Sequence, residues 1–483
     1  MLSLVREQRR LFLGATLAGL TLRLFFFVYF PQITDDSRIY ANLATNWLQH
    51  GIYGQTPAGA PTQPDQQIIP TDARLPGYPA FLAVIFSLFG AGNYKAVLLA
   101  QILFDLTTCL VVADLARRIF SERAARIAFL LAALCPFLAN YAAAELTETL
   151  EIFFTALALD AASAALMRMK DGKNAHPLWA ATGVAIAACI LLRPDGGILL
   201  AAVLLYLAFN GIARREGKAR LTLISLITVS LFALAPLVPW TIRNFRTLHH
   251  FQPLAPRYAS DANELVPNGF NRWVKTWIVD YVSVEELYWN VSGDPLDAAK
   301  LPSRAFDSPA QKDATLAAIA AYNDSNDMTP EVDAQFADLA ADRIASHPLR
   351  YYILLPVLRI ADMWLRPRTE ILPPDPRWWE FNDDAKHSVV ALGLGLLNLA
   401  YVGAAIMGLI RRRSEIRWAG LLLGFVLLRS AFLGTLENPE PRYTLECYPA
   451  MIVLASSLLA GKSRTDNGEM RGIDRNRRAK CLS

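Results

Sequence analysis

Ten long apolar runs, spread over the whole chain, constrain its fold more than any other feature of the sequence. Each is close to the length, about 20 residues, that an α-helix needs to cross the hydrocarbon core of a bilayer. A chain of 483 residues that is 54% hydrophobic and only 19% charged does not have the composition of a soluble protein. We therefore predict an all-α polytopic membrane protein. The runs lie near residues 11–30, 94–118, 124–141, 145–168, 178–192, 195–210, 221–240, 388–410, 416–435 and 443–460.

Lysine and arginine cluster in alternate loops, and this sets the expected orientation. Cytoplasmic loops retain positive charge, and with ten spans all the clusters fall on one side, together with both termini. The sequence therefore predicts a multi-pass protein of the plasma (inner) membrane, with cytoplasmic termini and an active site on the outer face. The clusters lie at residues 6–10, 117–126, 168–173, 214–220 and 411–417 and in the tail.

Two further apolar segments, 77–90 and 349–366, are short or interrupted by charge. If both crossed the membrane, the loops between them would be inverted and the charge pattern would break. We predict that they lie along the outer surface or dip into it, within a bundle of about 10–12 transmembrane helices.

The runs divide the chain into four regions. Residues 1–243 form an N-terminal membrane module that includes a first outer loop, 31–93. Residues 244–387 are too long for a connector, and their helical patches between prolines predict a helical outer subdomain. Residues 388–460 hold the last membrane helices, and 461–483 form a basic cytoplasmic tail. The net charge of +4 reflects the loops and the tail, so no nucleic-acid partner is needed to explain it.

Adjacent carboxylates, Asp35 and Asp36, follow directly after the first span. Apolar residues recur at helical spacing just beyond them, which predicts a short interfacial helix that begins at this pair. A carboxylate in that position can cap the helix N-terminus. It can also act as a base, and one cap would not require two acids.

Further charged residues gather at the predicted outer ends of the spans, although the loops that carry them are scattered along the chain. An ionisable residue there is a functional-site hypothesis by default. Each residue also has a structural alternative. An arginine can simply place its guanidinium at the level of the lipid head groups, and an acid can simply cap a helix. The residues that we single out are Arg74, Glu148, Arg193, Arg243 and Arg442.

Several of these residues stand in motifs whose order resembles that of the GT-C glycosyltransferases, in particular the branch of protein O-mannosyltransferases and lipid A aminoarabinose transferases. The resemblance covers roughly the first half of the chain, plus Arg442-Tyr443 near its end. The typical Asp-Glu pair is here Asp-Asp, and one proline of the basic-Pro-Pro element is missing. The motifs are Asp35-Asp36-Ser37-Arg38, Arg74-Leu75-Pro76-Gly77-Tyr78, Thr147-Glu148, Leu192-Arg193-Pro194-Asp195 and Arg243-Asn244.

The resemblance implies an inverting transferase that takes a sugar, such as a hexose or a pentose, from a polyprenyl-phosphate carrier and passes it to an acceptor outside the membrane. It implies that Asp35 or Asp36 supplies the catalytic carboxylate. A carboxylate suits the activation of an acceptor hydroxyl, and arginines suit the departing phosphate. The residues expected to bind the donor phosphate or the acceptor are Arg74, Tyr78, Glu148, Arg193, Arg243 and Arg442.

Three alternatives stay open at this stage. A divalent cation bridging Asp35 and Asp36 to the phosphate would suit these hard oxygen ligands. A multispan transporter or flippase of a lipid-linked anion would also need arginines along its path, but it predicts internal repeats, which the sequence lacks. A non-catalytic scaffold of an envelope complex would make the acids dispensable. The identity of the acceptor, whether glycan, lipid or protein, is not encoded in these motifs.

Overall fold

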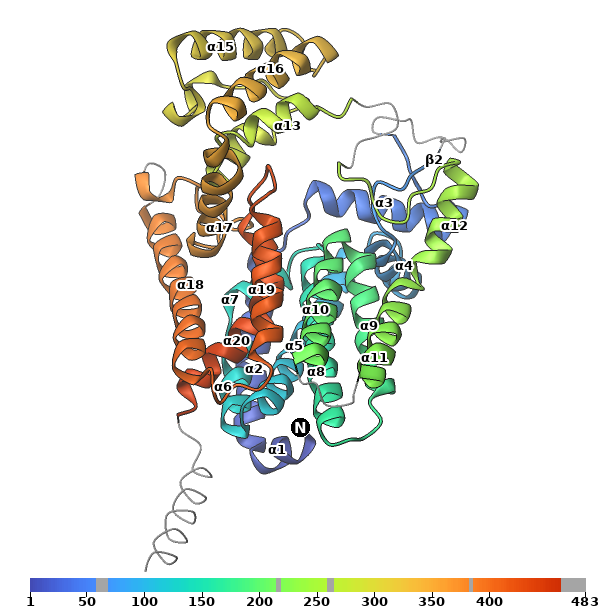
Figure 1. The fold of residues 1–483 in the computed structure, drawn as a ribbon. Coiled ribbons are helices and arrows are strands. Elements are labelled where there is room, and N and C mark those ends of the chain that lie inside the picture. The colour runs from blue at the N-terminus through green and yellow to red at the C-terminus, as the bar shows by residue number, and fades with distance from the viewer. Residues whose placement is uncertain (58–67, 214–218, 259–264, 382–384, 462–483) are drawn as a thin grey trace, which may run out of the picture.

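The computed structural model describes residues 1–57, 68–213, 219–258, 265–381 and 385–461. Within these residues the chain is almost wholly helical, which confirms the predicted fold class. The helices form a bundle, and a smaller helical region lies over one end of it (Figure 1). We call this region, residues 265–381, the cap, and the end of the bundle beneath it the cap-side end. Apart from Gly461, the predicted tail lies outside the described residues.

Helices from both ends of the sequence make up the bundle (Figure 1). The N-terminal part contributes α1 (Leu2–Glu7), α2 (Arg9–Tyr29), α5 (Tyr94–Ile119), α6 (Glu122–Ala133), α7 (Pro136–Tyr141), α8 (Glu148–Lys170), α9 (His176–Leu192), the 3₁₀ turn η1 (Pro194–Gly196), α10 (Gly197–Ala213), α11 (Ala219–Leu234) and α12 (Leu237–Leu248). The C-terminal part contributes α18 (Ala385–Arg412), α19 (Ala419–Leu433), the 3₁₀ segment η7 (Pro441–Cys447) and α20 (Tyr448–Leu459).

Not every predicted span is one long helix. Among the described residues, five helices are long and apolar enough to cross a membrane, and the pair α11 and α12, bent by 41°, makes up to six. Four other predicted runs coincide with α6, α9, α19 and α20, which have 12 to 17 residues. Pro136 explains one of these shorter helices, because a proline begins α7 and separates it from α6.

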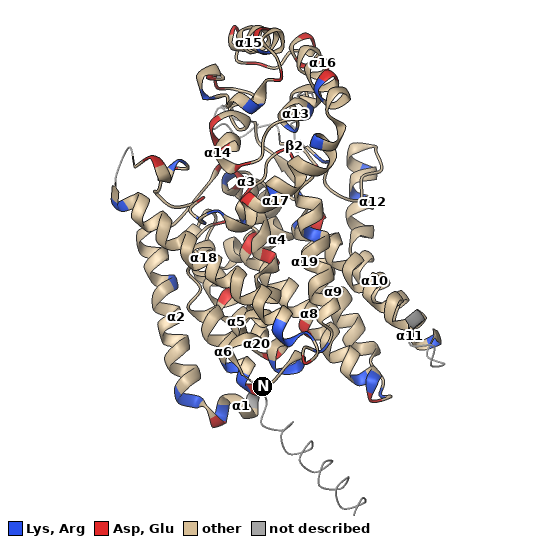
Figure 2. Ribbon diagram, turned by 60° about the vertical axis from the view of Figure 1, so that its left-hand side comes forward, with Lys and Arg blue, Asp and Glu red and all other residues tan. Residues whose placement is uncertain are grey.

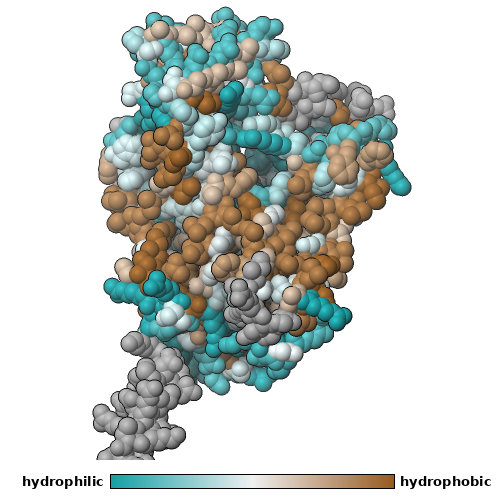
Figure 3. Space-filling model, in the orientation of Figure 1, coloured by the Kyte–Doolittle hydropathy of each residue, from teal (hydrophilic) through white to brown (hydrophobic). Residues whose placement is uncertain are grey.

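Charge and hydropathy divide the bundle into layers. Apolar side chains form a band across the middle of the visible face, with polar residues above and below it (Figure 3). Lysine and arginine gather at the end that carries α1, opposite the cap (Figure 2). Leu17 of α2 and Leu396 of α18 are exposed in the apolar range of these helices, as expected for side chains that face lipid. These features support a multi-pass membrane protein.

The first predicted outer loop folds against the cap-side end of the bundle (Figure 1). The predicted interfacial helix is α3 (Asp35–His50), which ends at Gly51 in the left-handed conformation. Strands β1 (Gly54–Gln55) and β2 (Ile69–Pro70) pair antiparallel, and α4 (Gly77–Phe89) follows. With 13 residues α4 is only about 20 Å long, too short to cross a bilayer on its own.

The cap has a hydrophobic core of its own. Phe270, Trp273, Trp277, Tyr322 and Phe336 are buried together in it. The predicted helical patches are therefore present as packed helices. The elements of the cap are α13 (Asn268–Val274), α14 (Tyr281–Ser283), η2 (Val284–Tyr288), η3 (Ala298–Lys300), η4 (Ser303–Ala305), α15 (Pro309–Asn323), α16 (Pro330–Ser346), η5 (Arg350–Leu354), α17 (Leu355–Leu365) and η6 (Trp378–Glu380).

Candidate active site

The two adjacent aspartates at the start of α3 point in different directions. Asp35 has a side chain that is 91% exposed, and it pairs with Arg38 at 2.8 Å. The Asp36 side chain is only 35% exposed, and its Oδ1 lies 2.9 Å from Nη2 of Arg74. Neither aspartate caps the helix, because the Thr34 hydroxyl accepts the hydrogen bond from the Ser37 amide. The capping alternative for Asp35 and Asp36 is therefore wrong.

Asp36 lies in a cavity of about 270 Å³ at the cap-side end of the bundle. Segments that are far apart in the sequence meet there, since the lining comes from α3, the loop before α4, the start of α8, the turn after α9, the chain after α12, and η7. The charged residues that line this cavity are Asp36, Arg74, Glu148, Arg193, Arg257 and Arg442. We call it the charged cavity.

The arginines of the charged cavity control the ionisation of Asp36. Burial alone would raise its pKa, but the guanidinium groups of Arg74 and Arg442 outweigh burial and hold the pKa of Asp36 below its usual value. Burial lowers the pKa of Arg74, but Tyr40 and the paired Asp36 outweigh burial and raise it above its usual value. Asp36 is therefore a carboxylate, and Arg74 a cation, across the physiological range.

Glu148 faces the same cavity from the first turn of α8 and is 2% exposed. Its Oε1 lies 3.9 Å from Nη1 of Arg193 and 3.7 Å from Nε of Arg442. Arg442 also lies 3.8 Å from Asp36. These separations are too long for hydrogen bonds, so the groups attract one another without being bonded. The Oε2 atom of Glu148 is buried and has no hydrogen-bond partner among the described residues.

Aromatic side chains support the charged cavity. The guanidinium of Arg193 lies 4.5 Å from the ring centroid of Tyr443, and Arg74 lies 5.9 Å from that of Tyr40. Tyr78, predicted to bind substrate, lies behind this layer. It packs edge-on against Tyr40, and its hydroxyl donates to Gln101 at 2.6 Å. Tyr78 therefore contacts the wall of the cavity and does not line it.

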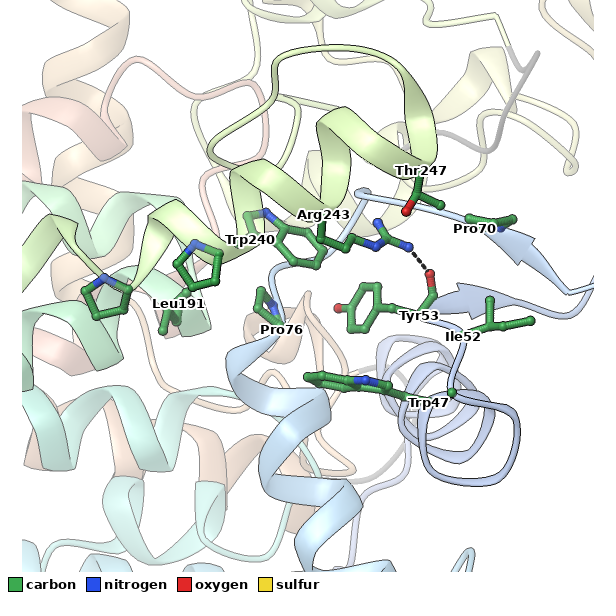
Figure 4. Close-up of a pocket in the computed structure, with 12 residues that line it drawn as sticks. Trp47, Ile52, Tyr53, Pro70, Pro76, Leu191, Trp240, Arg243 and Thr247 are labelled. Carbon is green, nitrogen blue, oxygen red and sulfur yellow. Dashed lines mark hydrogen bonds between the residues drawn. The ribbon is translucent and has the colours of Figure 1, made fainter.

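Arg243 lies in a different pocket, which Figure 4 shows. Its guanidinium donates to the backbone oxygens of Tyr53 and, at 2.8 Å, of Thr71. It thus fastens α12 to the loop that holds β1 and β2. This second pocket has a volume of about 510 Å³. We call it the apolar pocket, and it is lined by Trp47, Gly51, Ile52, Tyr53, Pro70, Pro76, Leu191, Pro236, Pro239, Trp240, Arg243 and Thr247.

The charged cavity and the apolar pocket are neighbours. Leu75 lines the first and Pro76 the second, and Leu192 and Leu191 are divided in the same way. Two short stretches of chain, one before α4 and one at the end of α9, therefore separate a cationic cavity from an apolar one.

A divalent cation held by Asp35 and Asp36 does not fit this arrangement. Asp35 points away to Arg38, and both oxygens of Asp36 face guanidinium groups. Across the part of the chain that the structure describes, no three His, Cys, Asp or Glu residues are grouped so that they could hold a metal ion. We derive no catalytic step through a metal.

Two charged residues, Arg257 in the lining of the charged cavity and Arg429 outside that lining, were not among the predicted site residues. Arg257 follows α12 and pairs with Glu437 at 3.1 Å; nothing in its local sequence distinguishes it from other loop arginines. Arg429 lies in α19, where it is the one charged residue between Ala419 and Leu433. A lone charge in an apolar run is a recognisable signal.

Comparison with known proteins agrees with the predicted resemblance. Residues 72–240 match the model of a family described as dolichyl-phosphate-mannose-protein mannosyltransferase. That range contains Arg74, Glu148 and Arg193, whereas Asp36 and Arg442 lie outside it. Among the curated proteins, none matches this chain.

Solved structures of the Archaeoglobus fulgidus oligosaccharyltransferase share the fold. One, tethered to an acceptor peptide, matches with a TM-score of 0.50 and 12% identity over 92% of this chain and 49% of its own. Another, the AglB protein in complex with an inhibitory peptide and a dolichol-phosphate, has the same score and identity over 94% and 50%. The chain has the GT-C fold. It spans about half the length of these archaeal proteins.

A third similar structure is ArnT from Cupriavidus metallidurans in the apo state. The match has a TM-score of 0.39 and 16% identity, and it covers 95% of this chain and 78% of that one.

Proposed function

We propose that this protein is an integral membrane glycosyltransferase that moves a sugar from a polyprenyl-phosphate carrier to an acceptor hydroxyl. The observation that carries the proposal is the direct adjacency of the charged cavity and the apolar pocket. A polyprenyl-phosphate sugar has the matching order of parts, because its anionic phosphate joins a polar sugar to an apolar chain. The mannosyltransferase family model that matches residues 72–240 supports the same class of reaction.

In this proposal the donor phosphate binds among Arg74, Arg193 and Arg442, whose guanidinium groups remain charged and can bind phosphate oxygens in pairs. The long contacts of Arg193 and Arg442 to Glu148 can be exchanged for shorter ones to the phosphate. The first isoprene units extend past Pro76 and Leu191 into the apolar pocket, beside Trp240.

Asp36, rather than Asp35, is the proposed base. Its carboxylate faces the cavity and is kept ionised by the neighbouring arginines. It takes the proton of the acceptor hydroxyl as the acceptor oxygen forms a bond to the anomeric carbon. The bond from that carbon to the phosphate oxygen breaks, and its electrons stay on the phosphate that the arginines stabilise. A single displacement of this kind inverts the anomeric centre.

We also propose that the charged cavity faces the outside of the cell. Lysine and arginine gather at the α1 end of the bundle (Figure 2), which is the cytoplasmic side by the positive-inside rule. The charged cavity lies at the opposite end, so the sugar is transferred on the outer side.

The test uses purified protein in liposomes with radiolabelled polyprenyl-phosphate sugars, a membrane extract as the acceptor source, and nucleotide sugars as comparison donors. We expect release or transfer of the sugar from one lipid donor and none from nucleotide sugars. Movement of an intact lipid-linked sugar across the bilayer without turnover would contradict the proposal and favour a flippase.

A further inference from the structure

A buried arginine in α19 ties together the two segments that carry the cavity arginines. Arg429 is 1% exposed in a helix that is otherwise free of charge. Its Nη2 donates to Oδ2 of Asp195 at 3.0 Å, and its Nε donates to the backbone oxygen of Tyr443 at 2.9 Å. The same Nη2 contacts the carboxylate of Glu446. One guanidinium therefore joins α19 to the turn after α9 and to η7.

Each of these attachment points adjoins a cavity arginine. Asp195 receives Arg429 on one oxygen, while its other oxygen lies 3.3 Å from Nε of Arg193. Tyr443 follows Arg442 in the chain, and its ring lies under the guanidinium of Arg193. Arg429 thus holds both the carboxylate that orients Arg193 and the backbone that carries Arg442, although it does not line the charged cavity itself.

The energetic cost of this arrangement argues for a role beyond packing. Arg429 brings two acids with it into the low-dielectric interior, and Oε1 of Glu446 has no hydrogen-bond partner among the described residues. Buried charges of this kind are frequently no more stabilising than apolar residues of similar size. An apolar side chain would pack in α19, but it could not fix two guanidinium groups at once.

We infer that Arg429 is a positioning residue for the donor phosphate, acting through Asp195 on Arg193 and through Tyr443 on Arg442. This inference rests on the proposed function and deepens it. A planar guanidinium can satisfy three acceptors in fixed directions, whereas a lysine ammonium holds them less rigidly. The phosphate-binding geometry, and not the chemical step, should therefore depend on the arginine.

The experiment compares wild type with Arg429→Lys in steady-state transfer and in the binding of free undecaprenyl phosphate, which carries the phosphate without a sugar. The expected result is an increase of about tenfold in both the KM for the sugar donor and the Kd for undecaprenyl phosphate, with kcat within about threefold of wild type. Arg23→Lys is the matched control, because Arg23 is equally buried and aspartate-paired, but neither Arg23 nor Asp105 lines the charged cavity. It should change neither constant.

Asp195→Asn provides a second route if Arg429→Lys does not fold. It removes the negative charge between Arg193 and Arg429 and leaves one acceptor oxygen in place of two, while Arg429 keeps Glu446 as its counter-ion. It should raise the same KM and Kd, and the double variant should be no worse than the more impaired single variant. If both variants lower only the folded yield, with KM and Kd unchanged, Arg429 is merely structural and the inference fails. If wild type neither turns over nor binds the lipid phosphate, the proposed function fails instead.

Discussion

Two clusters of buried charge, one deep between α2 and α5 and one at the cap-side end, use the same residue types in opposite ways. Arg23 is fully buried, and each of its guanidinium nitrogens has an acceptor. Its Nε lies 2.5 Å from Asp105. In the charged cavity, Arg442 has one short ion pair, with Glu440 Oε2 2.6 Å from its Nε, but its contacts to Asp36 and Glu148 are 3.8 and 3.7 Å long.

This difference distinguishes charged residues that hold helices together from charged residues that can bind a ligand. A saturated pair such as Arg23 and Asp105 has no capacity to bind a ligand and serves to join two helices. Arg193 and Arg442 have N–H groups whose nearest acids in the cavity are 3.7–3.9 Å away, even though Nε of Arg442 also pairs with Glu440, and they border about 270 Å³ of space. A buried charge in a membrane protein therefore indicates a binding site only where some of its hydrogen-bonding groups still lack close partners.

The largest effect should come from Asp36, the acid in the cavity. We expect Asp36→Asn to lower kcat by on the order of 1000-fold, because the amide cannot accept the acceptor proton. Asp35→Asn is the matched control, and its activity should stay close to that of wild type, since its exposed side chain pairs with Arg38 and does not line the charged cavity. Transfer from a radiolabelled lipid donor measures both. An equal fall in kcat in the two variants would contradict the assignment of Asp36 as the base.

Arg442→Gln should have the next largest effect. Loss of one preorganised cation near the departing phosphate should lower kcat/KM on the order of 100-fold. Arg412→Gln, at the end of α18 opposite the cap, removes an arginine that pairs with Glu415 and does not line the charged cavity. Transfer kinetics with this control should match wild type, and an equal fall in both variants would mean that charge in general, rather than the cavity, is needed.

Trp240→Ala tests the apolar pocket. Removal of this large side chain should raise the KM about tenfold for a long polyprenyl donor, because apolar contact with the chain is lost. A donor with a single isoprene unit should be affected much less. Trp289→Ala, an exposed tryptophan in the cap, is the control. A KM that rises equally for both chain lengths would argue against lipid in this pocket.

Arg74→Gln should change the pH dependence. Arg74 lowers the pKa of Asp36, and the base is active only as a carboxylate, above that pKa. Without Arg74 the pKa of Asp36 rises, so the acidic limb of the kcat/KM profile should move to higher pH. Arg38→Gln removes the arginine that pairs with Asp35 and does not line the charged cavity, so it should leave that limb in place. A limb that is unmoved by Arg74→Gln would show that Asp36 is not the titrating base.

The smallest kinetic effect should come from Asp105→Asn, in the saturated cluster. The variant leaves Arg23 buried without its counter-ion and should lose about 3–5 kcal/mol of stability. The folded fraction should keep its kcat and KM, because this pair does not reach the cavity. Thermal unfolding in detergent and transfer assays on the same sample measure both quantities. A changed KM would mean that the two clusters are coupled.

The sequence alone indicated much of this arrangement. Hydropathy predicted the bundle, the interfacial helix that became α3, and a helical cap. Motif order brought Asp36, Arg74, Glu148, Arg193 and Arg442 to one end of the membrane, and the structure brings these five into one cavity. Their shared position could be predicted because it depends only on which end of a span each residue follows; their roles stay predictions.

The direction in which each of these side chains points could not be predicted, because no local sequence pattern specifies it. Asp35 and Asp36 differ by one step of a helix, and only Arg74 and Arg442, 38 and 406 positions further along the chain, distinguish them. Arg243 follows its span as predicted, but the 41° bend between α11 and α12 accompanies its placement in the apolar pocket. Arg429 was not predicted, because it lies within a predicted membrane span and the predicted site residues were those at the ends of spans.

The most direct test of the account is a structure of the purified protein with a polyprenyl phosphate bound. The account predicts phosphate density within hydrogen-bond distance of Arg193 and Arg442 and close to Asp36, with the first isoprene units beside Trp240 in the apolar pocket. Phosphate density elsewhere, with the charged cavity unchanged, would contradict it.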